Sequence, residues 1–332
     1  MNYRYFFALL VIGALLAPAV SSAQVFWRVS VKVFTDSNGN RPAGRADDQI
    51  QDDYEYYNNL LRKYARGCTF SLTEIVQLPS SLSGWYNIQA RNAANRDFLL
   101  ANCTSNATLY AYRSDRINVY INNSSSGVCC GGGNGLSLTG NEDDHITPLH
   151  EIGHMLGLAH TQGCGACSEG CTTPGNDGVA DTIEDVECWS QNQISQNTFS
   201  EDYANLTAAQ RDQVDDVWLN VMSYHYGFFN NFLERLTAGQ MDRVAEKSNG
   251  DRDNVTGNYF RFVDLGTGND ADDGLTAAGA FRTVDGAITG SGADDVLLLR
   301  SGTYNKATAG AWILNQNRVL TSRNGTVRLT RQ

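Results

Sequence analysis

The sequence predicts an α+β protein in two folded parts, and three patterns support this prediction. Residues Gln24–Phe34 alternate between apolar and polar side chains and are rich in valine and aromatic residues, as is typical of a strand. Residues Asp47–Tyr64 place apolar side chains at helical spacing. From Tyr259 onward the chain consists of short β-rich runs. We therefore expect a larger part built from strands and long helices, followed by a small β-rich module.

The amino terminus has the pattern of a secretory signal peptide. Within Met1–Ala23, Arg4 is followed by an apolar run from Phe6 to Leu16 and then by small residues. A membrane anchor is the alternative interpretation, but a span needs roughly 20 apolar residues. We expect cleavage after Ala23 and a secreted protein, either extracellular or, in a Gram-negative bacterium, periplasmic.

Length and charge limit the classes of protein to which the chain can belong. Of the 332 residues, 332 − 23 = 309 remain after removal of the predicted signal peptide, which is still long for one domain. The hydrophobic fraction of 42% is enough for an ordinary core. The formal net charge of −11 argues against nucleic acid or an anionic membrane as a partner, because both repel a negative surface.

The remaining elements of the larger part follow in chain order. Gly67 ends the helix that begins at Asp47, and Gly157 ends another that carries several histidines. The segment from Thr161 to about Asn197 is polar, rich in glycine and cysteine, and shows little periodicity. The other predicted strands are Phe70–Val76, Ile117–Ile121 and Leu136–Leu138, and the other helices are Leu149–Leu158, Leu206–Trp218 and Leu236–Lys247, with Thr237 as an N-cap.

All 8 cysteines lie between Cys68 and Cys188. An even number of cysteines in an exported chain indicates disulfides, so we expect this segment to be one cross-linked unit whose pairing the sequence leaves open. The run Cys164–Cys171 could instead form a zinc site, but it lacks the second CxxC pair that such a site needs.

One segment of eleven residues, His150–His160, carries the strongest chemical pattern. Residues four apart on a helix share a face, so His150 and His154 present their imidazoles to one point. Glu151 lies between them and can reach water held at that point. Gly157 allows the chain to reverse and to return His160 as a third ligand. Three nitrogen ligands with one open position are typical of a catalytic zinc site.

A chance match is an unlikely origin of this arrangement. With only 5 histidines in the chain, composition alone gives roughly a few chances in a million of finding it. The extended pattern is the signature of the metzincin peptidases, so the chain resembles that group. The resemblance predicts a methionine turn beyond His160, and Asn220–Tyr224 supplies one with Met222. Met222 would form the apolar floor beneath the histidines.

Within the metzincins the chain looks like the pappalysin-type peptidases, which include the cytophagalysin-like bacterial enzymes. The likeness rests on Leu156–Thr161, Asn176–Thr182 and Leu236–Gln240, and it covers about residues 25 to 247. It implies a catalytic domain over 24–247. That domain would have a twisted mixed sheet, backing and active-site helices, and a loop-rich C-terminal subdomain. It also implies a secreted zinc endopeptidase that acts on proteins or peptides.

The resemblance also assigns roles to individual residues. Glu151 would be the general base, and Tyr224 would stabilise the oxyanion as the peptide carbonyl is attacked. Ile117–Ile121, as an edge strand above the cleft, would bind substrate as an added β-strand. A loop would hold a structural calcium ion with a simple Asp-Gly turn as the alternative, and the ligands would come from Asp177, Asp181 and Thr182, with Asp185 as a further candidate.

The carboxy-terminal part resembles the opening rungs of a right-handed parallel β-helix of the pectate-lyase-like type. The likeness rests on a series that includes Gly268-Asn269-Asp270, the segment Thr283–Ile288 and Arg300–Tyr304. We expect a linker over 248–257 and a module over 258–332. Only about 70 residues are present, too few for a full stack of rungs, so we expect a docking, substrate-recruiting or stabilising module that could bind a partner or a surface polysaccharide.

Two other functions remain open at this stage. The first is a carbohydrate-binding or surface-attachment protein with a vestigial zinc domain, although the intact His150, Glu151 and Met222 argue against a decayed site. The second is a hydrolase that cleaves a non-peptide amide at the same metal. We expect His145 and His225 to be surface residues or to lie behind the ligands.

Overall fold

The computed structural model describes most of the chain beyond the predicted signal peptide. Met1–Ala23, His145 and the run Cys164–Cys171 lie outside the described residues, so the structure does not test these predictions. The described residues are 25–63, 68–89, 92–124, 127–129, 136–139, 146–162, 174–187, 189–225, 235–292, 295–306, 312 and 319–330.

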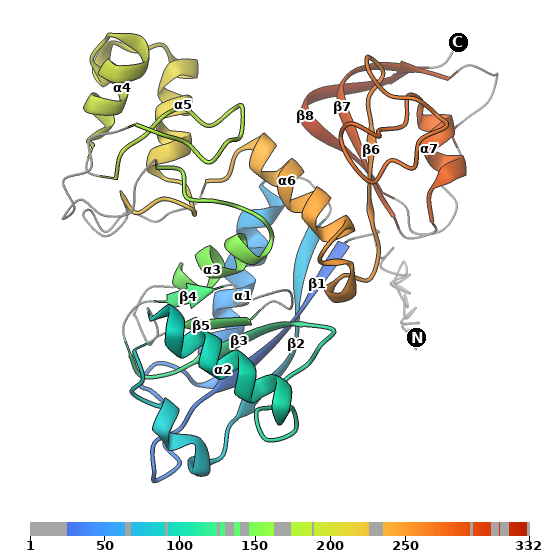
Figure 1. Ribbon diagram of the computed structural model, residues 1–332. Helices are drawn as coiled ribbons and strands as arrows, with labels where there is room; N and C mark the ends of the chain where they lie inside the picture. Colours follow the sequence, from blue (N-terminus) through green and yellow to red (C-terminus); the bar gives the residue numbers. More distant parts are fainter. Residues whose placement is uncertain are drawn as a thin grey trace, which may run out of the picture.

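The described elements confirm an α+β fold with largely parallel sheets (Figure 1). The strands are β1 (Val25–Val33), β2 (Cys68–Gln77), β3 (Ile117–Ile121), β4 (Gly127–Cys129), β5 (Leu136–Thr139), β6 (Phe260–Val263), β7 (Val296–Asn305) and β8 (Val319–Thr330). The α-helices are α1 (Asp47–Arg62), α2 (Ala93–Ser105), α3 (Thr147–Met155), α4 (Gln191–Phe199), α5 (Ala208–Trp218), α6 (Ala238–Asn249) and α7 (Val284–Gly290). Short 3₁₀ turns occur at Ser80–Trp85, Tyr203–Asn205 and Asp253–Val255.

A five-stranded sheet forms the larger part, in the order β2-β1-β3-β5-β4. The first four strands run parallel, and β4 is antiparallel to β5. Strand β3 lies inside the sheet, since Ile117 pairs with Val29 on one side and Asn118 pairs with Leu136 on the other. The expectation that Ile117–Ile121 is an edge strand is therefore wrong. The edge strand next to α3 is β4.

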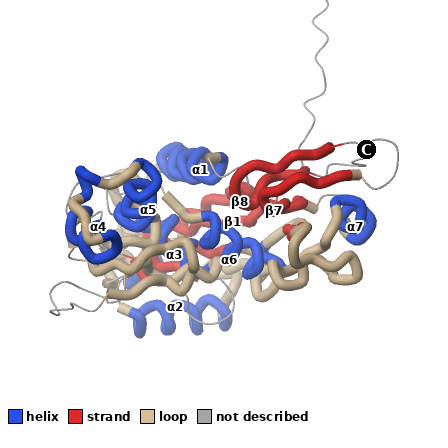
Figure 2. Tube along the Cα trace, turned by 90° about the horizontal axis from the view of Figure 1, so that it is seen from above, coloured by secondary structure: helices blue, strands red, loops and turns tan. Residues whose placement is uncertain are grey.

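The two faces of this sheet pack against different helices, as Figure 2 shows from above with α1 and α2 on opposite sides of the strands. Alternate residues of β1, such as Val29 and Val31, enter the core shared with α1 and α3. Tyr120 and Phe34 enter a second core under α2. Because both faces of the sheet are buried, β1 and β3 contain few exposed residues. Helix α3 packs against the face that also contacts α1.

The outer edge of β2 is protected by the helix that the sequence predicted. Helix α1 buries Ile50, Tyr54 and Tyr57 against the sheet. The side-chain amide of Asn58 donates to the carbonyl of Phe70 at 3.0 Å and accepts from its N–H at 2.7 Å. These two bonds replace those that a neighbouring strand would make, so the N–H and the carbonyl of Phe70 at the edge of the sheet both have partners.

A small helical subdomain, α4 and α5, stands apart from the sheet and carries its own core of Ile194, Val214, Val217 and Trp218 (Figure 1). Helix α5 begins with a capping box between Thr207 and Gln210. Helix α4 falls partly in the segment where we saw no periodic signal. It buries only Ile194 and Ser195, too few positions to produce a helical pattern.

The carboxy-terminal part contains a three-stranded parallel sheet in the order β6-β7-β8, with α7 beside it. Strand β8 is twelve residues long, so the end of the module is not a series of short runs as the sequence suggested. Helix α7 begins after Thr283, whose hydroxyl accepts from the N–H of Gly286.

The segment 248–257, which we expected to be a linker, is packed against both parts. Helix α6 continues to Asn249, whose side chain bonds both the N–H and the carbonyl of Phe260 at 2.9 and 2.7 Å. Trp27 of β1 donates to Ser248 at 2.8 Å and shares one continuous core with Phe260 and Val296. Ser248 and Asn249 are buried in these contacts, so the start of the expected linker belongs to helix α6 and packs between the two parts.

Cys68 and Cys103 are buried thiols and not halves of a disulfide. The expectation of a fully cross-linked cysteine segment is therefore wrong for these two residues. Cys68 lies in the core shared with α1 and α3, and Cys103 lies in the core under α2. In each core the thiol serves as a small apolar side chain. Within the described residues, no helix is both long and apolar enough to cross a bilayer.

Candidate metal centre

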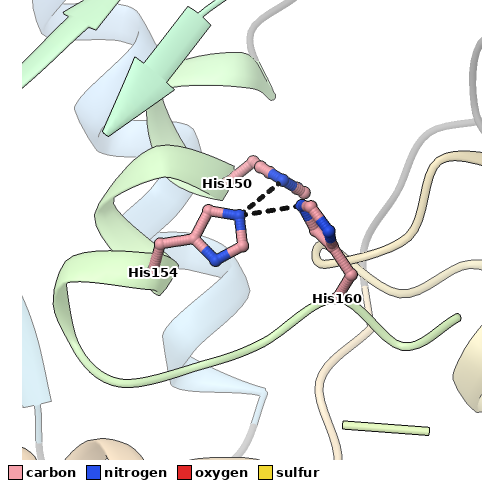
Figure 3. A group of neighbouring side chains, drawn as sticks. All are labelled: His150, His154 and His160. Carbon is pink, nitrogen blue, oxygen red and sulfur yellow. Dashed lines mark hydrogen bonds between the residues drawn. The ribbon is translucent and has the colours of Figure 1, made fainter. Parts of the chain in front are cut away.

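Helix α3 presents two histidines on one face because its other face is apolar. Leu149, Ile152 and Met155 enter the main core, which fixes the rotation of the helix about its axis. His150 and His154 follow the i, i+4 spacing and project together from the opposite side (Figure 3). The predicted helix thus exists, although it ends at Met155 rather than at Leu158.

Gly157 turns the chain back toward the helix, as the sequence predicted. Its φ is +91°, a conformation that favours glycine. The N–H of Leu158 returns to the carbonyl of Gly153 at 3.0 Å, which closes the end of the helix. The stem of Lys247 lies where a Cβ at Gly157 would point, 3.3 Å away. The reversed chain then brings His160 to the two helical histidines (Figure 3).

The three imidazoles converge through their Nε2 atoms. The Nε2 of His154 is 3.1 Å from that of His150 and 2.9 Å from that of His160. The Nδ1 of His150 donates to the carbonyl of Val221 at 2.7 Å, and the Nδ1 of His154 donates to the carbonyl of Leu158 at 2.8 Å. Because a carbonyl only accepts, both Nδ1 atoms carry hydrogen, and a neutral ring then has its lone pair on Nε2.

This geometry fits a metal ion. Lone pairs that face each other at about 3 Å repel unless a cation lies between them, and burial lowers the pKa of His154, which disfavours the imidazolium form. Burial, followed by the charge of His154, also lowers the pKa of His160 to about 4. Tetrahedral ligands at zinc distances would have their nitrogens roughly 3.3 Å apart, close to the spacing found here. Among the described residues, these three histidines are the group that could hold a metal.

The predicted catalytic residues lie beside the histidines. Glu151 follows His150 on α3 and is buried, with 7% of its surface exposed. The ring of Tyr224 is half-buried, and its centre lies 4.4 Å from that of His160 and 5.6 Å from that of His150. Glu151 and Tyr224 therefore both lie next to the three histidines that could hold a metal ion.

Met222 lies directly beneath α3. It is fully buried, and a Cβ at Gly153 would come within 2.5 Å of its Sδ atom. Its carbonyl accepts from the N–H of Thr161, the residue after the third histidine, at 3.3 Å. The turn thus contacts both helix α3 and the chain segment that returns after Gly157, which agrees with the role expected of Met222.

A buried polar relay holds this turn, and the sequence alone did not reveal it. Asn220 accepts from the N–H of Met222 at 2.9 Å and donates to Gln240 of α6 at 2.9 Å. Gln240 in turn donates to the carboxylate of Asp177 at 2.7 Å. Asn220 and Gln240 both stand in motifs that we recognised, but only the fold brings them together.

The predicted calcium ligands Asp177 and Asp181 instead accept hydrogen bonds from the loop and from the start of α6. Both carboxylate oxygens of Asp177 accept hydrogen bonds, from Val179 and Gln240. Those of Asp181 accept from Thr237 and Gly239 at the start of α6. Arg243 donates to the carbonyls of Asp177 and Gly178, so a cation already occupies that side of the loop. The buried hydroxyl of Thr182 has no hydrogen-bond partner in the described part of the chain. These contacts favour the simple turn over a calcium site.

His225 lies behind the site, as expected, and pairs with Asp185. Its Nε2 is 2.7 Å from the Asp185 carboxylate, and both side chains are buried. Asp185 therefore serves this pair rather than the loop of Asp177. The pairing of residues 40 positions apart leaves no local signal in the sequence.

Comparison with known proteins adds no relative, because no family model and no curated protein matches the chain. The fold and the site by themselves define a class: an α+β protein in which a three-histidine group at the end of a helix can hold a metal ion.

Proposed function

We propose that the chain is a secreted zinc-dependent endopeptidase. The observation that supports this most directly is the convergence of the Nε2 atoms of three histidines at the end of α3, with Glu151 on the same helix. Two of the rings are oriented by backbone carbonyls, which is how proteins prepare imidazoles as metal ligands. Three such ligands leave one tetrahedral position for water or substrate.

Zinc suits this site because imidazole nitrogens are among its preferred ligands, and when bound it supplies Lewis acidity that lowers the pKa of water and polarises a carbonyl. Glu151 would take a proton from the attacking water and pass it to the leaving amine, and its position next to His150 on α3 supports this role. The hydroxyl of Tyr224 would donate a hydrogen bond to the charge that develops on the carbonyl oxygen, and the short distance between the Tyr224 and His160 rings supports this role. His150 and His154 stay fixed through their carbonyl partners, so little reorganisation is needed.

The sheet offers a place for an extended peptide substrate. Strand β4 is antiparallel to β5 and forms the edge of the sheet next to α3. We propose that a substrate strand pairs with the outer side of β4, in place of the internal strand β3. Main-chain hydrogen bonds would then hold the peptide across the site whatever its sequence, which is the behaviour of an endopeptidase.

Cleavage of casein and of a peptide library by the purified chain tests the proposal. Removal of metal with 1,10-phenanthroline should abolish cleavage, and zinc should restore it. The substitution Glu151→Gln should lower kcat about 10²- to 10⁴-fold, the usual contribution of a general base. The matched control is Glu55→Gln, an exposed residue of α1, which should leave kcat unchanged.

The outcomes separate the proposal from its alternatives. Full activity of Glu151→Gln would falsify the assignment of the base. A chain that binds zinc but cleaves only small non-peptide amides would be a different hydrolase. A chain that takes up no zinc at micromolar concentration would overturn the proposal as a whole.

A further inference from the structure

We propose that Asp185 and His225 form a positioning pair that fixes Tyr224 beside the three histidines. This inference rests on the proposed peptidase function and adds to it two residues that act through Tyr224. It is carried by contacts on three sides of the pair.

The Asp185 side chain has no freedom to move. It is fully buried, and one carboxylate oxygen accepts from the N–H of Val186 at 2.7 Å. The other oxygen lies 2.7 Å from the Nε2 of His225. The backbone of Asp185 is bonded in both directions to Gly175, through contacts of 2.7 and 3.2 Å. A carboxylate held this way is a rigid acceptor, and its hydrogen bond fixes the plane of the imidazole.

The His225 ring is held on its face as well as at its edge. It stacks on Trp218, with the ring centres 4.3 Å apart and the planes inclined by 23°. Trp218 belongs to the core of the α4–α5 subdomain, which gives the ring a solid support. The N–H of His225 also donates to the hydroxyl of Ser223 at 3.1 Å. The side chain and the backbone of His225 are therefore both constrained.

Tyr224 lies between two anchored neighbours. On one side Met222 is buried against Gly153 and held by Asn220. On the other side His225 is held by Asp185. Hydrogen bonds thus hold the backbone on both sides of Tyr224, and the centre of its ring lies 4.4 Å from that of His160. A hydrogen-bond donor to a reacting carbonyl needs placement within about 0.5 Å, and a buried pair beside it can supply that accuracy.

A positioning role and a merely structural role predict different behaviour. If the pair acts through Tyr224, its loss lowers kcat but changes neither the KM nor the zinc affinity. It also has no effect once the Tyr224 hydroxyl is absent. If the pair only supports the fold, its loss affects stability and metal binding in every background.

A double-mutant cycle tests this directly. His225→Leu, Asp185→Asn and His225→Gln are each made in the full chain and in Tyr224→Phe. The measurements are kcat and KM for a fluorogenic peptide, zinc affinity by competition with a chromogenic chelator, and binding of a phosphinic peptide that imitates the tetrahedral intermediate. We expect His225→Leu to lower kcat and phosphinic-peptide affinity about 10- to 100-fold, with KM and zinc affinity within about 2-fold.

The conservative variant His225→Gln distinguishes loss of the hydrogen bond to Asp185 from loss of folding. The Nε2 of a glutamine can still donate to Asp185, so His225→Gln should recover much of the lost kcat. In Tyr224→Phe the same His225→Leu change should cost less than about 2-fold, because the hydroxyl that the pair positions is gone.

The results also distinguish the inference from the proposed function. Equal losses in both backgrounds, or a zinc affinity that falls in step with kcat, would overturn the positioning role while the peptidase assignment stands. A wild-type chain that cleaves no peptide would overturn both.

Discussion

At the scale of single residues, Gly153 is the position where helix α3 packs most closely against Met222, next to the three histidines. It lies between His150 and His154 on α3 and faces Met222. A Cβ there would lie 2.5 Å from the Met222 Sδ atom, well inside contact distance. The glycine is therefore needed for close packing, since its φ lies outside the left-handed region.

We expect Gly153→Ala to lower the free energy of unfolding by about 1–3 kcal/mol, the usual cost of overpacking a core. Displacement of Met222 should also weaken zinc binding, because the turn supports both the helix and Thr161. Urea unfolding and chelator competition measure the two effects. Gly84→Ala is the control, since a Cβ there meets nothing within 4 Å. Equal stability of the two variants would contradict the packing argument.

Lys32 is an unusual residue of the second core. Its side chain is fully buried, donates to Asn118 at 2.5 Å, and lies over the ring of Tyr120. Burial lowers its pKa from 10.5 to about 7, with a smaller opposing effect from Glu74. The unfolded chain therefore binds a proton between pH 7 and 10.5 that the folded chain does not.

Stability should for this reason rise with pH across that window, and below pH 7 the contribution of Lys32 should no longer change with pH. The slope approaches about 1.4 kcal/mol per pH unit, the value for one proton. We expect Lys32→Met to remove this slope and to stabilise the protein near pH 7. The measurement is urea unfolding from pH 6 to 10, with Lys63→Met, an exposed residue at the end of α1, as the control. An unchanged slope in Lys32→Met would count against the buried ammonium.

At the scale of elements, the start of α6 connects the acidic loop to the methionine turn. Thr237 caps the helix and accepts from Gln240, as the sequence predicted. Asp181 adds a second cap by accepting from Thr237 and from the N–H of Gly239 at 2.8 Å. The negative charge also lies at the positive end of the helix dipole.

We expect Asp181→Ala to cost about 1–2 kcal/mol of stability, through loss of a cap and of a charge at a helix N-terminus. Thermal unfolding with and without calcium measures this. The midpoint should fall in the variant, and calcium should leave both proteins unchanged, because the loop oxygens already have donors. Asp272→Ala, at an exposed position in the module, is the control. A calcium-dependent midpoint in the unchanged chain would restore the calcium site.

At the scale of the whole molecule, the carboxy-terminal module is continuous with the larger part. Trp27 of β1 lies 6.4 Å from Phe260 between ring centres, within one core. Arg323 of β8 donates to Asp242 of α6 at 2.5 Å. Arg252, just beyond α6, donates to the carbonyl of Met155 at the end of α3. Of the roles expected for the module, this packing favours stabilisation of the larger part, including helix α3.

We therefore expect one cooperative unfolding transition for both parts. Phe260→Ala should lower the free energy of unfolding by about 3–5 kcal/mol, and zinc should be released at the same urea concentration at which helicity is lost. Circular dichroism and a zinc-sensitive dye follow the two events. Leu265→Ala, in the same module but 43% exposed, should have little effect. Two separate transitions would show that the parts fold independently.

Much of the fold and the site could be predicted, but to different degrees. The pattern around His150 predicted the ligand face and the turn at Gly157, because helical spacing and glycine conformation are local properties. The capped helix after Thr237 was found for the same reason. Helix α4 was missed because it buries only Ile194 and Ser195. The internal position of Ile117–Ile121 was missed because strand order depends on partners far along the chain.

Three imidazoles and a carboxylate at fixed spacing, the residues of the turn around Met222, and the apolar faces of the main elements can all be read from the sequence. These features depend on residues a few positions apart, where backbone geometry alone sets the relation. The tertiary structure alone decided which partners hold that chemistry in place. The pairing of His225 with Asp185, the relay through Gln240, and the core shared by Trp27 and Phe260 join residues that are distant in the chain. Such contacts are selected by the packing of the whole fold, and no local pattern encodes them.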